Sequence, residues 1–199
     1  PYLDVTHLGR EGSDLIVGPA FDDVCCVAGL VETMKMLKED PPRSLKVCFV
    51  ATVQEELGLR GARTSCFDID PQVGIAVDVT HASDYPAADK RVTGEVTLGK
   101  GVVIERGANI NPVIGDLLID TAVKKRIPYQ LSAAPNATGT DANVMQISRS
   151  GVAAGLVSVP NRYMHTAVEV CSLTDLENCA KLVAETIACI NGRMSFITK

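Results

Sequence analysis

Residues 50–61 read VATVQEELGLRG, where an apolar run meets two adjacent acids and a glycine-rich turn. The β-branched, apolar stretch Leu45–Val53 predicts a central strand of a sheet, with Glu55 and Glu56 at its tip. Two neighbouring carboxylates at such a place repel each other and are costly to desolvate, so a divalent cation is the leading candidate for their partner. One acid would then bind the ion while its neighbour serves as a base. The alternative is a solvated pair that opens a loop.

The composition favours one well-buried domain without a basic surface. The chain has 199 residues, of which 46% are hydrophobic and 22% charged, and its net charge is −5. We therefore expect no nucleic-acid partner and no attraction to anionic membranes. The seven cysteines are an odd number without CxxC spacing, which disfavours a zinc knuckle or a disulfide framework. With no signal peptide or long apolar span in evidence, these features predict a cytoplasmic protein.

Helical and strand patterns alternate along the chain, which is typical of an α/β fold. We expect a single catalytic-type domain over residues 1–199. The predicted strands cover 14–18, 45–53, 73–77, the neighbourhood of 102, 129–133 and 151–159. The predicted helices cover 24–38, 112–125, 141–148 and 173–191, with a turn or short helix at 61–65.

Candidate site residues follow several of the predicted strands. Asp22 follows the first strand, Glu55 and Glu56 the second, Asp78 the third, and His165 the strand that ends near residue 159. In open α/β sheets the carboxyl ends of the strands form the functional crevice, so we expect these side chains to meet there. Carboxylate oxygens together with a histidine nitrogen suit zinc, cobalt or manganese.

Each of these residues also has a purely structural interpretation. Asp23 is expected to cap the helix that follows, which leaves Asp22 to point into the crevice. Asp78 is equally consistent with a turn, and a lone His165 is more often a loop or core residue than a ligand. The segment 138–141 (TGTD) reads either as a capped helix start or as a loop that lines a substrate pocket.

Five segments, taken in order, resemble the tetrahedral (TET) aminopeptidases, a family of dinuclear metallopeptidases some of whose members were labelled endoglucanases. The segments are 20–23 (AFDD), 52–61 (TVQEELGLRG), 76–82 (AVDVTHA), 139–142 (GTDA) and 162–170 (RYMHTAVEV). The resemblance covers nearly the whole chain. It implies a zinc-peptidase-like α/β fold, with a mixed, largely parallel central sheet flanked by helices on both faces.

The resemblance also implies roles for individual residues. Asp22 would bridge two divalent ions, most simply zinc or cobalt, while Glu56 and His165 would complete one ion's ligands. Asp78 would belong to the other ion, and Glu55 would be the general base for a metal-activated water. Thr140 and Asp141 would line the substrate pocket, and the substrate would be a peptide with a free N-terminus.

This sequence departs from the family at its N-terminal end. Family members are longer, and their N-terminal region supplies a histidine to the second metal and an inserted β domain that helps to build a twelve-subunit shell. Only 21 residues precede Asp22 here, and the surroundings of His7 do not resemble the family's ligand motif. We therefore expect a fragment, a natural truncation or one piece of a split protein. Its second metal site would be weakened, and a homo-oligomer or a missing N-terminal segment would be its partner.

Two functions from different classes follow from these observations. The first is a metal-dependent aminopeptidase that removes N-terminal residues from peptides. The alternative is a catalytically inactive or incomplete remnant that binds at most one metal and acts as an assembly or partner subunit. A glycosidase is disfavoured, because adjacent acids on one strand end do not flank a sugar bond at the required separation of about 5–9.5 Å.

Overall fold

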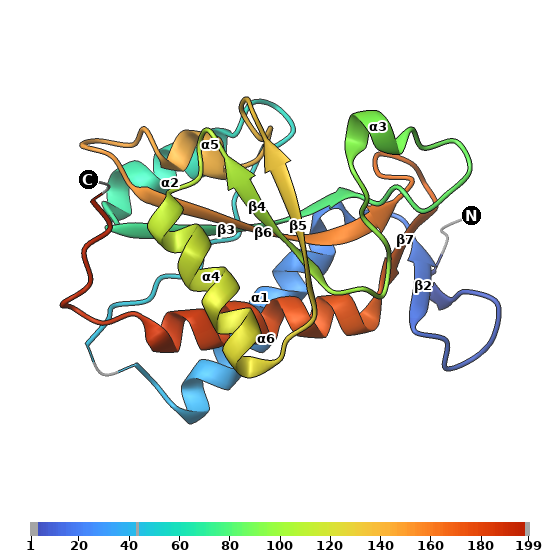
Figure 1. Ribbon diagram of the computed structural model, residues 1–199, viewed down its shortest axis with the longest axis horizontal. Coiled ribbons are helices and arrows are strands. Elements are labelled where there is room, and N and C mark those ends of the chain that lie inside the picture. The colour runs from blue at the N-terminus through green and yellow to red at the C-terminus, as the bar shows by residue number, and fades with distance from the viewer. Residues whose placement is uncertain (1–3, 43, 198–199) are drawn as a thin grey trace.

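In the computed structural model, residues 4–42 and 44–197 are described, and their strands form one mixed sheet (Figure 1). The strands are β1 (Thr6–His7), β2 (Leu15–Gly18), β3 (Val73–His81), β4 (Val102–Gly107), β5 (Tyr129–Ala134), β6 (Ala153–Arg162) and β7 (Glu169–Ser172). Their spatial order is β1-β2-β7-β6-β4-β5, with β3 paired to β6. The two longest ladders, β3–β6 and β4–β5, are parallel, whereas the pairings of β1, β2 and β7 are antiparallel.

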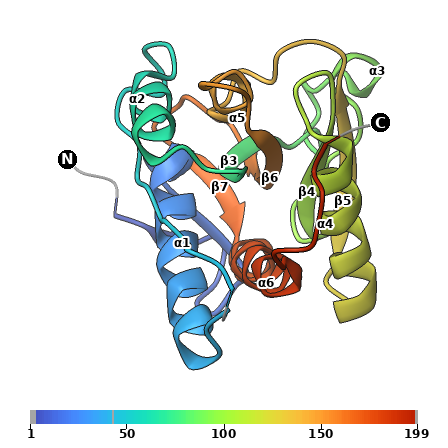
Figure 2. The ribbon, with the colours of Figure 1, turned by 90° about the vertical axis from the view of Figure 1, so that its left-hand side faces the viewer.

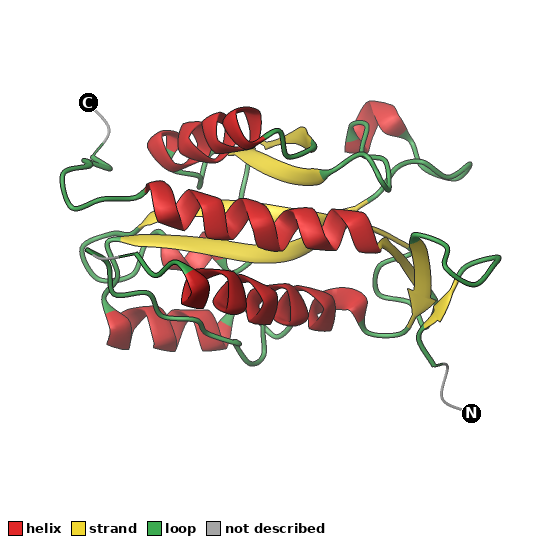
Figure 3. Cartoon of the chain, turned by 90° about the horizontal axis from the view of Figure 1, so that it is seen from below, coloured by secondary structure: helices red, strands yellow, loops and turns green. Residues whose placement is uncertain are grey.

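Helices cover both faces of this sheet, as the sequence predicts. They are α1 (Phe21–Glu39), α2 (Arg60–Ile69), α3 (Lys90–Thr93), α4 (Pro112–Lys125), α5 (Ala142–Met145) and α6 (Leu173–Cys189). The long helices α1, α4 and α6 lie together on one face, while α2 and α5 lie on the other (Figures 2 and 3). None of the described helices combines the length and the apolar character that crossing a bilayer requires.

The core lies between the sheet and the three long helices. Ile104 of β4, Ile114 and Leu118 of α4 and Leu182 of α6 are fully buried there. Local sequence defines the helix ends. The Asn111 side chain accepts hydrogen bonds from the backbone N–H groups of residues 113 and 114, proline follows it, and two lysines lie in the last turn. The predicted bounds of this helix, 112–125, are therefore confirmed.

The prediction of a central strand at Leu45–Val53 is wrong. This segment has no regular secondary structure, and Cys48 and Val53 within it are exposed. It borders a cavity of about 1430 Å³ that β3 also lines. A strand forms only where a neighbouring strand pairs with its backbone, and no described strand pairs with this segment.

The end of this segment is nevertheless held in place. The backbone N–H of Gly61 in α2 donates to the carbonyl of Val53 at 2.9 Å. A Cβ on Gly61 would meet the Val53 nitrogen at 2.4 Å, so only glycine permits this approach. The Thr52 hydroxyl donates to Asp141 at 2.7 Å. The turn that carries Glu55 and Glu56 is therefore fixed although the predicted strand before it is absent.

Other departures concern the bounds of elements. β3 continues to His81, so Asp78 lies within the strand and not after it, and α5 is shorter than the predicted helix 141–148. The short elements β1, β7 and α3 were not predicted. β1, with two residues, is too short to carry a periodic pattern of its own.

Candidate metal centre

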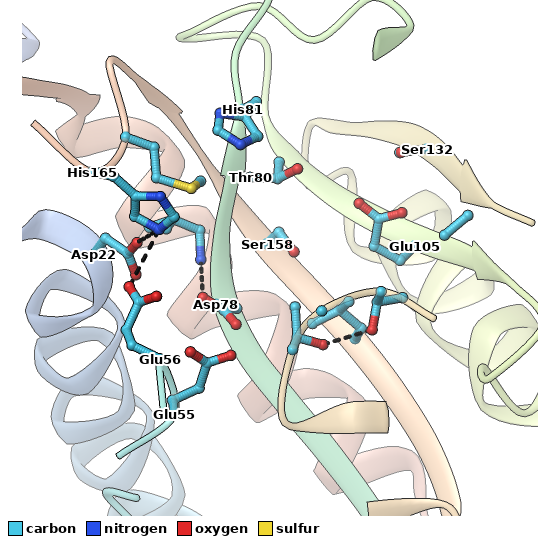
Figure 4. Close-up of a pocket in the computed structure, with 17 residues that line it drawn as sticks. Asp22, Glu55, Glu56, Asp78, Thr80, His81, Glu105, Ser132, Ser158 and His165 are labelled. Atoms are coloured by element: carbon cyan, nitrogen blue, oxygen red, sulfur yellow. Dashed lines mark hydrogen bonds and ion pairs between the residues drawn. The ribbon is translucent and has the colours of Figure 1, made fainter. Parts of the chain in front are cut away.

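Asp22, Glu56 and His165 lie together at one end of the sheet (Figure 4). The Nε2 atom of His165 is 3.0 Å from Asp22 Oδ2 and 3.3 Å from Glu56 Oε1. One donor atom from each residue lies within 4.8 Å of the other two. These three come from the start of α1, the turn before α2 and the loop after β6. Two carboxylate oxygens and an imidazole nitrogen at such separations fit the ligand chemistry of a divalent metal ion.

Burial and neighbouring negative charges raise the pKa values of the acids in and around these three candidate ligands. Burial raises the pKa of Asp22 to about 6, with a further contribution from the charge of Glu56. Burial and the charge of Asp141 raise the pKa of Glu55 to about 7. Burial likewise raises the pKa of Asp78 to about 7, against a backbone hydrogen bond that lowers it. A bound cation would stabilise the ionised form of all of them.

Asp78 and Glu55 border the same cavity without joining the close group of three. The Asp78 Oδ1 atom accepts a hydrogen bond from the backbone N–H of Val79 at 2.8 Å, which fixes its rotamer. Glu55 lies beside Glu56, below Asp22 in Figure 4. Both carboxylates are thus available to a second ion, to water or to substrate.

Glu169 is a supporting residue that the sequence did not single out. It lies on β7, is 2% exposed, and accepts hydrogen bonds from the backbone N–H groups of Asp22 at 3.0 Å and His165 at 3.1 Å. One buried carboxylate thus fixes the two segments that carry two of the candidate ligands. The only signal in the sequence was an acid between two valines in the segment 168–170.

The backbone around the ligands is unusual. Ala20, Gln54, Tyr163 and His165 all have positive φ angles, between 58° and 63°, and the Asp22–Asp23 peptide bond is cis. The left-handed region costs a non-glycine residue of the order of 1–3 kcal/mol and persists only where the surroundings enforce it. Such conformations cluster at functional sites, and here they flank each of the segments that carries a ligand.

The ligands open into a cavity of about 330 Å³, which we call the site cavity. This volume is at the lower end of the range for small-molecule sites, about 300–1,000 Å³. Thr140 lines the site cavity. Asp141 lies behind it, on the larger cavity, where it accepts the hydrogen bond from Thr52.

The remaining candidates take other positions. No helix-capping hydrogen bond from Asp23 is found among the described residues. Its Oδ1 atom is buried without a partner, and burial raises its pKa to about 9. His7 is exposed on β1, where its Nδ1–H donates to the Ser13 carbonyl at 2.7 Å, and it does not line the site cavity. His81 does line it, with its ring centroid 6.5 Å from that of His165.

The sequence profile of the M42 glutamyl aminopeptidases matches residues 5–182. The chain belongs to this family. Among relatives of this M42 chain, the lysyl aminopeptidase of Pyrococcus furiosus is 46% identical over 164 residues, which are 82% of this chain and 46% of that protein. The resemblance of the five sequence segments to the TET aminopeptidases is thereby confirmed.

Solved structures of related enzymes confirm the fold of this M42 chain. An aminopeptidase from the archaeon Desulfurococcus kamchatkensis is 39% identical with a TM-score of 0.82, covering 94% of this chain and 52% of that one. The TET1 peptidase of Pyrococcus horikoshii, which assembles into a tetrahedron or a large octahedral shell, is 30% identical with a TM-score of 0.76. That comparison covers 92% of this chain and 52% of the other. The chain thus spans about half the length of these relatives.

Proposed function

We propose that this M42 chain carries the catalytic residues of a metal-dependent aminopeptidase, which hydrolyses the N-terminal residue from peptides. The observation that carries the proposal is the meeting of Asp22, Glu56 and His165 at 3.0–3.3 Å, with Glu55 beside them in one cavity. Names of related proteins, among them a lysyl aminopeptidase, agree with this reaction.

The residues divide into ligands and a base. Asp22, Glu56 and His165 would hold one divalent ion, and Asp78 with Asp22 would hold a second one more weakly. When bound, such an ion polarises a peptide carbonyl and makes water a stronger acid. Zinc and cobalt both suit this donor set.

Glu55 would move the proton. Its carboxylate borders the site cavity, and none of the hydrogen bonds found among the described residues occupies it. It would take a proton from the attacking water and return that proton to the leaving amine. A pKa near the working pH lets one carboxyl perform both steps, and burial moves the pKa of Glu55 in that direction.

A homo-oligomer is the proposed assembly, since a related TET1 peptidase forms tetrahedral and octahedral shells. In these relatives other sequence accompanies the matched region, because each comparison covers about half of the related chain. The proposed activity therefore belongs either to this chain or to its complex with such a segment.

The decisive test is hydrolysis of chromogenic aminoacyl substrates by the chain after addition of zinc or cobalt. We expect metal-dependent turnover that a chelator abolishes. Glu55→Gln should lower kcat by about 10²–10⁴-fold. Glu39→Gln is the matched control, because it removes the same charge from an exposed position at the far end of α1.

Absence of turnover with every metal would favour the alternative, an inactive subunit that binds one ion. Turnover that survives Glu55→Gln unchanged would contradict the assignment of the base.

A further inference from the structure

Glu105 faces the site cavity from the side opposite the metal ligands. It lies on β4, is 6% exposed, and appears in Figure 4 across β3 and β6 from Asp22 and Glu56. Neither the proposed chemistry nor the ligand set uses this carboxyl group.

The charge of Glu105 has no cationic partner among the described residues. The Ser132 hydroxyl donates a hydrogen bond to it, but no described Lys or Arg lines the cavity. The neighbouring Arg106 is engaged elsewhere, with its Nη1 atom 2.6 Å from Asp116 Oδ1. Burial raises the pKa of Glu105, because a carboxylate withdrawn from water without a cation is destabilised. Glu105 is therefore a buried acid for which the described residues supply no counter-ion, and a cation brought next to it would stabilise its ionised form.

The walls of the site cavity are partly apolar. Val79, Ala134, Leu156 and Met164 line the cavity together with hydroxyl-bearing residues. Such a surface suits a methylene chain whose charged end lies beyond it, as in lysine and arginine side chains.

We propose that Glu105 selects peptides whose N-terminal residue is basic, by binding the ammonium or guanidinium group of that residue's side chain. This inference rests on the proposed aminopeptidase function and names its substrate class. The α-amine and the first peptide bond lie toward Asp22, Glu55 and Glu56, and the side chain extends across the cavity to Glu105. A charge-assisted hydrogen bond to a carboxylate as buried as Glu105 is strong enough to decide the specificity.

The same geometry rejects acidic N-terminal residues. In the metal-loaded protein the bound ions would offset the charges of Asp22, Glu56 and Asp78, whereas Glu105 would still oppose the carboxylate of a substrate side chain with a like charge. This chain should therefore differ in preference from the glutamyl activity after which its family is named.

The test compares three aminoacyl p-nitroanilides: lysyl, norleucyl and glutamyl. Norleucine keeps the length of lysine without its charge, so the lysyl-to-norleucyl ratio of kcat/KM isolates the ammonium group. We expect the metal-loaded wild-type protein to prefer the lysyl over the norleucyl substrate at least about tenfold, and to be slowest on the glutamyl substrate.

Glu105→Gln should lower kcat/KM for the lysyl substrate about 10–100-fold, the range for a hydrogen bond to a charged group. The norleucyl value should stay within about threefold, because no ammonium group is lost.

Controls separate this inference from the proposed function. Glu39→Gln should leave all three rates unchanged, whereas Glu55→Gln should lower all three. Equal loss of the lysyl and norleucyl activities in Glu105→Gln, or no wild-type preference for lysine, would overturn the role of Glu105 while leaving the aminopeptidase assignment intact.

If the chain alone turns over no substrate, the proposed function fails for the isolated chain, and binding decides the inference. Calorimetric titration with lysinamide and norleucinamide should then show tighter binding of lysinamide to the wild type, and equal binding of the two to Glu105→Gln. Equal binding to the wild type would overturn the proposal.

Discussion

Glu169 accepts a hydrogen bond from the backbone N–H of Asp22 at 3.0 Å, although 147 positions separate the two residues in the sequence. Its second oxygen accepts the backbone N–H of His165 at 3.1 Å. The relative placement of the two segments that carry the candidate ligands Asp22 and His165 thus depends on one buried carboxylate outside the candidate ligand group.

Glu169→Gln should therefore weaken metal binding without removing a ligand. An amide has one acceptor oxygen, so its NH₂ group would face one of the two backbone N–H donors. We expect zinc affinity to fall about 10–100-fold, as for other residues that orient ligands. We also expect the free energy of unfolding of the metal-free protein to fall by about 1–3 kcal/mol. Zinc calorimetry and urea denaturation measure these two effects.

Glu177→Gln is the control, because Glu177 lies at an exposed position on α6, and this substitution should change neither quantity. An unchanged zinc affinity in Glu169→Gln would contradict the positioning role of Glu169.

Glu55 and Glu56 are neighbours in sequence, yet their substitution should separate chemistry from metal binding. Glu56 Oε1 lies 3.3 Å from His165 Nε2, whereas Glu55 stands outside the group of three potential ligands. Glu56→Gln should weaken zinc binding by more than the roughly 100-fold that an orienting residue costs. Glu55→Gln should leave zinc affinity close to that of the wild type. Both variants lose one charge at adjacent positions, so equal weakening would show that only the local charge matters.

The pair Asp84–Arg162 anchors the start of the loop that carries His165, and its contribution to stability should depend on pH. Arg162 Nε lies 2.6 Å from Asp84 Oδ1, and Nη2 lies 2.7 Å from Oδ2. Burial alone would raise the pKa of Asp84, but hydrogen bonds from Arg162 and from the Leu98 backbone outweigh this and lower it.

Because this pKa is lower in the folded state, the stabilisation is present above the unfolded pKa of about 3.9 and is lost as the pH falls through the folded value. Arg162→Gln should therefore lower the free energy of unfolding by about 1–3 kcal/mol at pH 7. The difference from the wild type should shrink between about pH 4 and pH 2. Urea denaturation at several pH values measures this, and a difference that stays constant down to pH 2 would refute the ion pair's role.

Because segment 44–53 has no regular secondary structure and leaves Cys48 exposed, we expect the thiol of Cys48 to be reactive. Cys48 is exposed, Cys189 is partly buried, and the other five cysteines are buried. A thiol reagent should therefore label Cys48 first in the folded protein, and Cys48→Ser should remove that fast phase. If Cys48 is as slow as the buried thiols, the segment is covered in solution, as it would be in a central strand.

The sequence predicted much of the fold because its signals were local. Helix α4 has a side-chain cap, a proline in its first turn and lysines in its last turn. All the signals that define its two ends therefore lie within residues 111–126. The sequence also named Asp22, Glu56 and His165, which the structure brings together, because polar residues directly after strand-like patterns indicate the functional edge of a sheet. The pattern before Glu56 gave this indication although it does not form a strand.

The sequence by itself determined which residues could serve as ligands and base, and which stretches could become helices. Tertiary structure alone decided whether 45–53 became a strand, because an apolar, β-branched segment needs a neighbour for its backbone hydrogen bonds. It also decided the roles of Glu169 and Glu105, two acids on strands. Glu169 accepts hydrogen bonds from the backbone of the segments that carry Asp22 and His165, whereas Glu105 faces the site cavity. Such surroundings arise only when segments that are distant in the sequence pack together.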